Sequence, residues 1–180
     1  MRRMSRALRR CSCPLAVALA IAAAHTGPEP RASFDAASAG RVARWVDGDT
    51  LHATLAGRDV TVRLLGAGAP ETHRRAQCGG AAATKLARRL LPVGTRIVVR
   101  TDRASGDVSD AYGRRLGFVD GPRGDVGEAL IRAGRATVYR YKQRRFARLK
   151  RYRAAERAAR HARRGSWRTC PAFDTADADR

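Results

Sequence analysis

Residues 42–65 read VARWVDGDTLHATLAGRDVTVRLL, and this stretch decides the fold. Val42 to Val46 is a short strand candidate, and Asp47-Gly48 is a strong signal for a hairpin turn. Thr50 to Leu55 follows as the return strand, and after a second polar turn Val60 to Leu65 alternates as a third strand. The stretch therefore predicts three short strands joined by tight turns.

The rest of the chain adds two strands and three helices to this start. We expect helices at Gly80–Leu91, at Val126–Ala133 and, strongly basic, at Arg144–Arg164, and strands at Arg96–Thr101 and Leu116–Val119. The buried stripe of the basic helix is expected to consist of Phe146, Leu149, Tyr152, Ala155, Ala159 and Ala162. Five short strands with helices late in the order predict a closed OB-type β-barrel with about three helices packed on it.

The N-terminus has the pattern of an export signal. Five arginines precede a short apolar core at Leu15 to Ala23, and small residues for cleavage follow it. We therefore expect a signal peptide at residues 1–24, a flexible linker at 25–40 and a secreted, extracellular protein. A retained signal anchor is the alternative, although the apolar run is about half the length that a membrane span requires. After cleavage we expect a monomer without stable membrane association.

The charge of the chain points to polyanionic partners. The sequence carries 37 Lys and Arg against 16 Asp and Glu, a net charge of +21, and removal of five leader arginines lowers it to +16. Such a surface attracts nucleic acid more often than any other partner. A GC-rich coding bias explains the arginines equally well, because Lys85, Lys142 and Lys150 are the only lysines. For the arginine-rich faces of the basic helix, a solvated surface is favoured over a nucleic-acid contact.

Two cysteines, Cys78 and Cys170, lie beyond the expected leader. They have no Cys-x-x-Cys spacing and no nearby His pair, so a zinc site is not indicated. In an exported protein one such pair suggests a disulfide, which would tie the C-terminal tail back onto the domain. Two unrelated buried thiols are the alternative.

Three motifs bring together the side chains that phosphodiester chemistry needs. VDGDT at 46–50, RLLGAGAPE at 63–71 and YGR at 112–114 supply two arginines and several carboxylates. Arginine forks match phosphate oxygens two at a time, and carboxylates hold a hard cation or accept a proton from water. The motifs therefore indicate an enzyme that breaks phosphodiester bonds.

These motifs, followed by GSW at 165–167, occur in the order and spacing of the staphylococcal (micrococcal) nuclease, or thermonuclease, family, which the chain resembles. Further matches are the run GEALIRAG at 127–134 and Glu156, eleven residues before Trp167. The resemblance implies an OB-type barrel with three helices and a calcium-dependent nuclease that cleaves DNA and RNA and leaves 3′-phosphates.

The resemblance runs from about Arg41 to Trp167, and we therefore expect the nuclease domain at 41–168. Residues 169–180 are expected to form an acidic tail, tethered through Cys170.

The resemblance also implies the catalytic residues. Arg63 and Arg114 correspond to the two phosphate-binding arginines, and both can stabilise the extra negative charge on a five-coordinate phosphorus. Arg114 is also expected to aid the leaving 5′-oxygen. Glu71 corresponds to the carboxylate that orients or deprotonates the attacking water.

The metal-binding positions are only partly retained. Asp49 resembles a direct calcium ligand, and Ala69 stands where a backbone carbonyl coordinates the metal. Gly68 occupies the position of the second carboxylate ligand, so calcium affinity and activity are both expected to fall. Three explanations stay open: a relocated acid such as Asp47 compensates, the enzyme works slowly at high calcium, or the site is degenerate.

Tyr112, Tyr139, Tyr141 and Lys142 resemble the nucleotide-contacting surface of the family, and the partners expected are DNA and RNA, with single strands favoured. Core or barrel-rim packing is an equal alternative for Tyr139 and Tyr141.

The rival to a nuclease is an exported nucleic-acid-binding module that has lost turnover because Gly68 replaces a metal ligand. A module that binds anionic cell-wall polymers has only the charge in its favour.

Overall fold

The computed structural model describes residues 37–73, 76–106, 108–171 and 173, all within the unit Ser33–Arg180. The expected signal peptide and most of the expected linker lie outside the described residues. No helix in the described part of the chain is both long and apolar enough to cross a bilayer.

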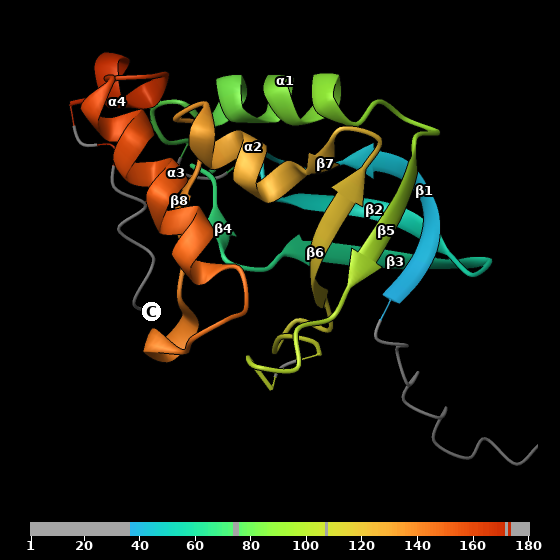
Figure 1. Ribbon diagram of the computed structural model, residues 1–180. Coiled ribbons are helices and arrows are strands. Elements are labelled where there is room, and N and C mark those ends of the chain that lie inside the picture. Colours follow the sequence, from blue (N-terminus) through green and yellow to red (C-terminus); the bar gives the residue numbers. More distant parts are fainter. Residues whose placement is uncertain (1–36, 74–75, 107, 172, 174–180) are drawn as a thin grey trace, which may run out of the picture. The chain divides into compact units, whose positions relative to one another are not determined.

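Five strands form a closed barrel (Figure 1). The strands are β1 (Ala37–Trp45), β2 (Thr50–Leu55), β3 (Arg58–Leu64), β5 (Arg96–Arg100) and β6 (Arg115–Gly121). Antiparallel pairs join β3 to β2, β2 to β1, β1 to β5 and β5 to β6, and the parallel pair between β3 and β6 closes the ring. The predicted OB-type barrel is therefore confirmed.

The β2–β3 hairpin shows how the sequence forms this barrel. Leu55 pairs with Arg58 across a two-residue turn, in which Ala56 and Gly57 both have positive φ, as a type I′ turn requires. Alternation then places Leu51, Ala53, Val62 and Leu64 inside the barrel, where all are buried. A shift of one residue in this register would expose these side chains.

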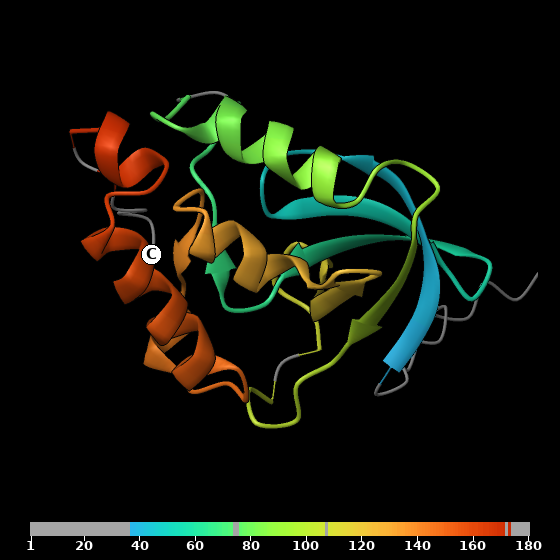
Figure 2. The same ribbon diagram turned by 45° about the horizontal axis from the view of Figure 1, so that its top comes forward.

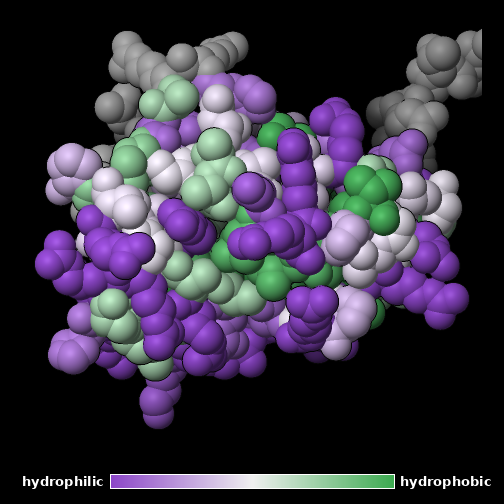
Figure 3. Space-filling view, turned by 90° about the horizontal axis from the view of Figure 1, so that it is seen from above, coloured by the Kyte–Doolittle hydropathy of each residue, from purple (hydrophilic) through white to green (hydrophobic). Residues whose placement is uncertain are grey.

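Three helices and one short helix pack on the barrel. They are α1 (Gly80–Leu90), α2 (Val126–Arg132), α3 (Leu149–His161) and α4 (Ser166–Thr169). In the views of Figures 1 and 2, α2 lies between the barrel and α3, and α1 crosses one end of the barrel. From the α1 side, Figure 3 shows hydrophilic side chains over most of the face, with hydrophobic residues between them.

Short elements connect these layers. They are β4 (Ala67–Gly68), β7 (Gly124–Asp125), β8 (Thr137–Val138) and the 3₁₀ turn η1 (Tyr141–Gln143). The pair β4–β8 joins the chain that follows β3 to the chain that follows α2. It therefore holds the RLLGAGAPE segment close to the predicted nucleotide-contacting tyrosines.

Two expected boundaries differ from the structure. Residues 37–40 were assigned to the linker, but they belong to β1, where Ala37 pairs with Arg100 of β5 and Gly40 pairs with Ile97. Small residues carry little strand propensity, so only the pairing reveals this part of the strand.

The basic helix begins at Leu149 instead of Arg144. Before it, the Ala147 N–H donates to Asp102 Oδ2, and Phe146 packs against Phe118 and Tyr152 with ring centroids 5.6–6.2 Å apart. These tertiary contacts hold residues 144–148 outside the helix. Within the expected stripe Tyr152, Ala155 and Ala159 are buried, whereas Ala162 is exposed.

Cys78 and Cys170 are joined by a disulfide that spans 92 residues of sequence. Beyond it, the Phe173 ring is buried and packs edge-on against Trp167 with centroids 4.7 Å apart. The segment after Thr169 thus contributes two buried side chains, Cys170 and Phe173, to the folded unit.

Candidate active site

Arg63 lies near the end of β3 and is fixed by the chain that follows it. Its Nη1 donates to the carbonyls of Leu64 and Ala67, at 3.0 and 2.6 Å, and its Nη2 lies 3.1 Å from Asp49 Oδ2. A guanidinium has five N–H bonds, so these contacts leave Nε–H and one Nη2–H for another acceptor. The side chain is thereby oriented in advance and keeps a two-donor edge of the kind that matches phosphate.

Asp49 is a buried carboxylate at the centre of this cluster. Its Oδ2 accepts from the Ala69 N–H at 2.5 Å, and its Oδ1 accepts from the Thr50 hydroxyl at 3.1 Å. Burial raises the pKa of Asp49 above its ordinary range, Arg63 opposes that shift, and Asp47 adds to it. Asp49 therefore joins the β1–β2 turn to the RLLGAGAPE segment, with Arg63 as its counter-ion.

Asp47 shapes the turn that presents Asp49. Asp47 Oδ1 accepts from the backbone N–H groups of Asp49 and Thr50, at 3.0 and 2.8 Å, and this is the pattern of an Asx turn. One of the two oxygens of Asp47, the acid that the sequence offered as a relocated ligand, is thus used to hold the backbone.

The oxygen atoms near Asp49 do not fit the calcium site that the resemblance implies. Calcium takes six to eight oxygens, preferably charged ones. Here Gly68 offers no side chain, both oxygens of Asp49 already accept hydrogen bonds, and Arg63 occupies the Asp49 Oδ2 side. Within the described residues no group of three or more His, Cys, Asp or Glu side chains is placed to hold a metal. The calcium requirement stays a prediction.

Glu71 lies two residues beyond Ala69 and is exposed. Its backbone is clamped by Gln77, which accepts from the Glu71 N–H through Oε1 and donates its own N–H to the Glu71 carbonyl, both at 2.9 Å. Among the described residues the Glu71 carboxylate has no recorded partner, so its backbone is fixed while its carboxylate faces solvent. This is the state that a group acting on a water molecule requires.

Arg114 is held by a loop carboxylate that the sequence analysis did not single out. Arg114 Nε donates to Asp110 Oδ2 at 2.7 Å, while Asp110 Oδ1 accepts from the N–H groups of Tyr112 and Arg114, each at 3.0 Å. The contact leaves both Nη atoms of Arg114 available to a phosphate. The i, i+4 spacing of Asp110 and Arg114 was the signal that could have revealed the pair.

The parallel β3–β6 pairing brings the two arginines to one side of the barrel. Arg63 pairs with Leu116, and Arg114 precedes Leu116 by two residues. Arg114 lies directly before β6, so the pairing brings its backbone close to the end of β3 that carries Arg63. The motif arginines, 51 residues apart in sequence, are therefore placed by one strand pairing.

A pocket beside Arg63 contains two of the predicted nucleotide-contacting tyrosines. Arg63, Leu116, Tyr139 and Tyr141 all line it. The Arg63 guanidinium lies 5.5 Å from the Tyr139 ring centre, a cation–π distance.

The other two predicted contacts lie outside that pocket. The exposed Tyr112 stacks on Arg114 at 5.3 Å, and Lys142 lies 5.3 Å from the Tyr141 ring.

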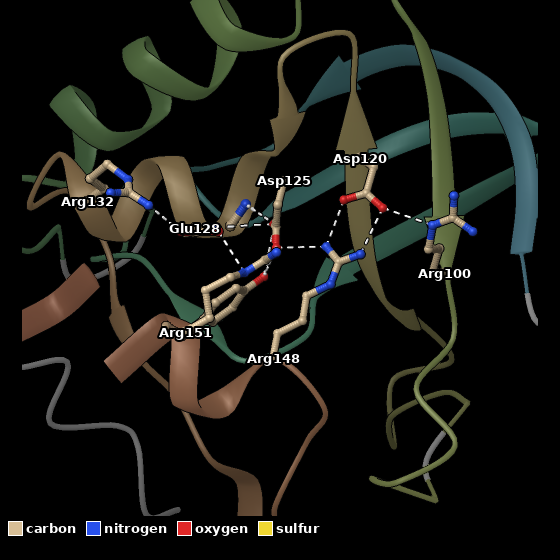
Figure 4. A network of polar contacts seen from close by, with 9 residues as sticks. Arg100, Asp120, Asp125, Glu128, Arg132, Arg148 and Arg151 are labelled. Atoms are coloured by element: carbon tan, nitrogen blue, oxygen red, sulfur yellow. Dashed lines mark hydrogen bonds and ion pairs between the residues drawn. The ribbon is translucent and has the colours of Figure 1, made fainter. Parts of the chain in front are cut away.

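A second set of charged side chains, away from this pocket, was not foreseen. Figure 4 shows Arg148 and Arg151, at the start of α3, directed toward carboxylates of β6, β7 and α2. We call this set the paired-arginine network, and it consists of Arg100, Asp120, Asp125, Glu128, Arg132, Arg148 and Arg151. It shows that four arginines of this basic chain pair with carboxylates of the folded unit.

Comparison with known proteins agrees with the geometry. The family model for staphylococcal nuclease homologues matches residues 61–169, more than half of the chain. Two similar relatives, from Escherichia coli O157:H7 and Escherichia coli, are each named "Uncharacterized endonuclease" and are 37% identical over 101 residues. The aligned part covers 56% of this chain and 60% of the length of each of these curated relatives. The chain therefore belongs to the staphylococcal nuclease family.

Proposed function

We propose that the protein is a nuclease that hydrolyses phosphodiester bonds of DNA and RNA, with single strands favoured. One observation carries the proposal: Arg63 and Arg114 are each held by a carboxylate, keep unused N–H groups and lie at the neighbouring ends of the paired strands β3 and β6. Two such guanidinium groups suit a phosphoryl group whose negative charge grows in the transition state.

In the proposed reaction these residues act in one displacement at phosphorus. Glu71 orients a water molecule and accepts its proton while the water oxygen forms a bond to phosphorus. The bond between phosphorus and the 5′-oxygen breaks, Arg63 and Arg114 stabilise the charge on the phosphoryl oxygens, and the 5′-oxygen leaves as a hydroxyl after taking a proton from solvent. The products are a 3′-phosphate and a 5′-hydroxyl.

A cleavage assay with the full chain tests this proposal. End-labelled single-stranded DNA is incubated with the wild type, with Glu71→Gln, and with Asp59→Asn as a control at an exposed carboxylate of β3. We expect cleavage to fall on the order of 10² to 10⁴-fold in Glu71→Gln and to stay unchanged in the control. Equal cleavage by Glu71→Gln and the wild type would remove Glu71 from the mechanism.

The second candidate is a nucleic-acid-binding module with impaired turnover, and Gly68 favours it. Gly68 lies in the extended strand β4 without a positive φ, so its backbone accepts other residues. We expect Gly68→Asp to restore a carboxylate beside Asp49 and to raise both calcium affinity and calcium-dependent cleavage. If neither rises, the assignment of Gly68 as a missing ligand is wrong.

We further propose that the protein is exported and acts as a monomer. The Cys78–Cys170 disulfide supports export, because such bonds persist in oxidising compartments. N-terminal sequencing of the protein recovered from outside the cells tests this, with a start near residue 25 expected. A start at Met1, in protein that stays with the membrane, would support the retained anchor.

A further inference from the structure

A basic groove runs along α3, beside the pocket at Arg63. We define it by the five cationic residues that line it: Arg140, Arg145, Lys150, Arg153 and Arg157. Among the residues that the structure describes, no carboxylate lines this groove. In the paired-arginine network carboxylates neutralise the arginines, whereas the positive charges of this groove are left for a ligand.

The groove continues from the pocket that contains Arg63. Arg140, Arg145 and Phe146 line both the pocket and the groove. A polymer bound at Arg63 can therefore pass these shared residues and extend along α3 without leaving the protein surface.

Four of the five cations of the groove form no ion pair with the described residues. Arg145, Lys150, Arg153 and Arg157 are exposed, and the described residues offer none of them a recorded ion pair. Arg140 differs, since it contacts Gln143. The four exposed side chains keep their N–H donors for a ligand.

Their arrangement also opposes helix stability. Lys150, Arg153 and Arg157 are three and four residues apart, so they share one face of α3 and repel each other. Two of them lie in the first half of the helix, and its first turn contains no acidic residue. Positive charge near a helix N-terminus is unfavourable, because the macrodipole is positive there. Folding alone does not account for such a stripe, whereas binding of a polyanion does.

We propose that the basic groove binds the phosphate backbone of a nucleic-acid strand on one side of the nucleotide held at Arg63. The inference rests on the proposed function for the identity of the polymer and adds the path that it follows. From Lys150 to Arg157 the helix rises about 10 Å, which spans on the order of three phosphates at helical stacking distance. Substrates of several nucleotides therefore gain contacts that a dinucleotide cannot make.

Matched charge removal tests the groove. Lys150→Ala/Arg153→Ala/Arg157→Ala in the full chain removes three charges from the groove, and Lys85→Ala/Arg88→Ala/Arg89→Ala removes three from the exposed face of α1. Both sets replace helix residues with alanine, the best helix former, so both proteins are expected to fold. Binding of a twelve-residue oligothymidylate and of a thymidine dinucleotide is measured by anisotropy, between low and moderate salt.

The groove variant is expected to bind the oligomer on the order of tenfold or more weakly, with a logarithmic salt slope reduced by about 2, since each single-strand phosphate contact contributes about 0.7. Dinucleotide binding is expected to match the wild type. Equal losses in the groove and α1 variants, or equal losses for oligomer and dinucleotide, would overturn the proposal.

Cleavage by the same preparations separates this proposal from the proposed function. Groove-dependent oligomer binding without cleavage by the wild type supports the groove and refutes the nuclease. Cleavage with groove-independent binding refutes the groove alone.

Discussion

Two sets of basic side chains lie along the same helix, and they differ in whether carboxylates lie beside them. In the paired-arginine network, Arg148 and Arg151 contact Asp120, Asp125 and Glu128 at 2.7–2.8 Å. In the basic groove, Lys150, Arg153 and Arg157 have no recorded carboxylate partner in the described part of the chain. The difference teaches that the placement of acids on neighbouring elements, and not the abundance of arginine, decides which cations hold the fold and which can bind substrate.

Helix geometry explains how one segment serves both purposes. At 3.6 residues per turn, Lys150, Arg153 and Arg157 share a face, and Arg148 and Arg151 lie on another side. The second side meets α2 and the β6–β7 hairpin, which carry the carboxylates. A change at one position of α3 should therefore affect either stability or binding, and only slightly both.

The largest expected effect is that of Asp125→Ala. Asp125 caps α2 through the N–H groups of Gly127 and Glu128, accepts from the Tyr152 hydroxyl, and pairs with Arg148 and Arg151. Removal of this nearly buried carboxylate takes away the cap of α2 and the acceptor of the Tyr152 hydroxyl, and it leaves Arg148 with Asp120 alone and Arg151 with Glu128 alone, so the free energy of unfolding should fall by about 3–5 kcal/mol. Urea denaturation measures this, with Asp59→Ala as an exposed control. A loss no larger than in the control would show that the network does not hold α3.

The next effect concerns the disulfide, which secures the end of the chain after α3. Cys78 follows Gln77, whose side chain accepts a hydrogen bond from the Glu71 N–H. Cys78→Ser/Cys170→Ser therefore frees the segment at Cys170 and loosens the loop from Glu71 to Cys78. We expect a loss of about 2–4 kcal/mol in the free energy of unfolding, together with weaker cleavage. The reduced wild type should match the double variant in both measurements. Unchanged cleavage would show that the Glu71 loop is held without the bridge.

A smaller effect is expected at Asp120, and it depends on pH. Hydrogen bonds from Arg148 lower the pKa of Asp120 despite its partial burial, and Arg100 adds to the shift. Because the folded pKa is lower than the unfolded one, the ionised carboxylate stabilises the protein above about pH 4, and this contribution is lost as pH falls through the folded pKa.

Asp120→Asn should cost about 1–2 kcal/mol near neutral pH, allowing for solvent screening, and should flatten the decline of stability in acid. Denaturation midpoints from acidic to neutral pH measure both. An acid decline as steep as that of the wild type would contradict the assignment.

The smallest expected effect on stability is that of the groove. Arg153→Ala/Arg157→Ala removes like charges from one helix face, so the free energy of unfolding should stay within about 0.5 kcal/mol of the wild type. Thermal melting at low and high salt checks this. A larger loss would mean that these side chains serve the fold after all.

Much of this architecture could be predicted from the sequence because local signals agreed with the tertiary structure. The β2–β3 hairpin combines alternation with a turn that tolerates positive φ, and the predicted bounds of β2 are those observed. The family motifs lie in the turn before β2, at the end of β3 with the segment that follows it, and directly before β6, so the motif spacing also indicated the site.

What the sequence could not reveal depends on contacts between distant residues. Residues 37–40 become a strand only through pairing with β5, and Phe146 leaves the expected helix because an aromatic cluster takes it up. The carboxylate partners of Arg148 and Arg151 lie 23 to 28 residues away along the chain. The basic sequence of this segment does not distinguish arginines that pair with carboxylates from arginines that face solvent. A solvated helix surface was therefore the favoured interpretation of both.

The central claim is that the paired-arginine network holds α3 in the fold whereas the basic groove binds the strand, and Arg151→Ala against Arg153→Ala tests it most directly. The measurement pairs the free energy of unfolding with the salt slope for oligothymidylate binding, in the two variants and the wild type. We predict that Arg151→Ala lowers stability by about 1–3 kcal/mol and leaves the slope unchanged, because it loses charged hydrogen bonds to Asp125 and Glu128. Arg153→Ala should leave stability unchanged and reduce the slope by about 0.7. The same response from both variants would contradict the account.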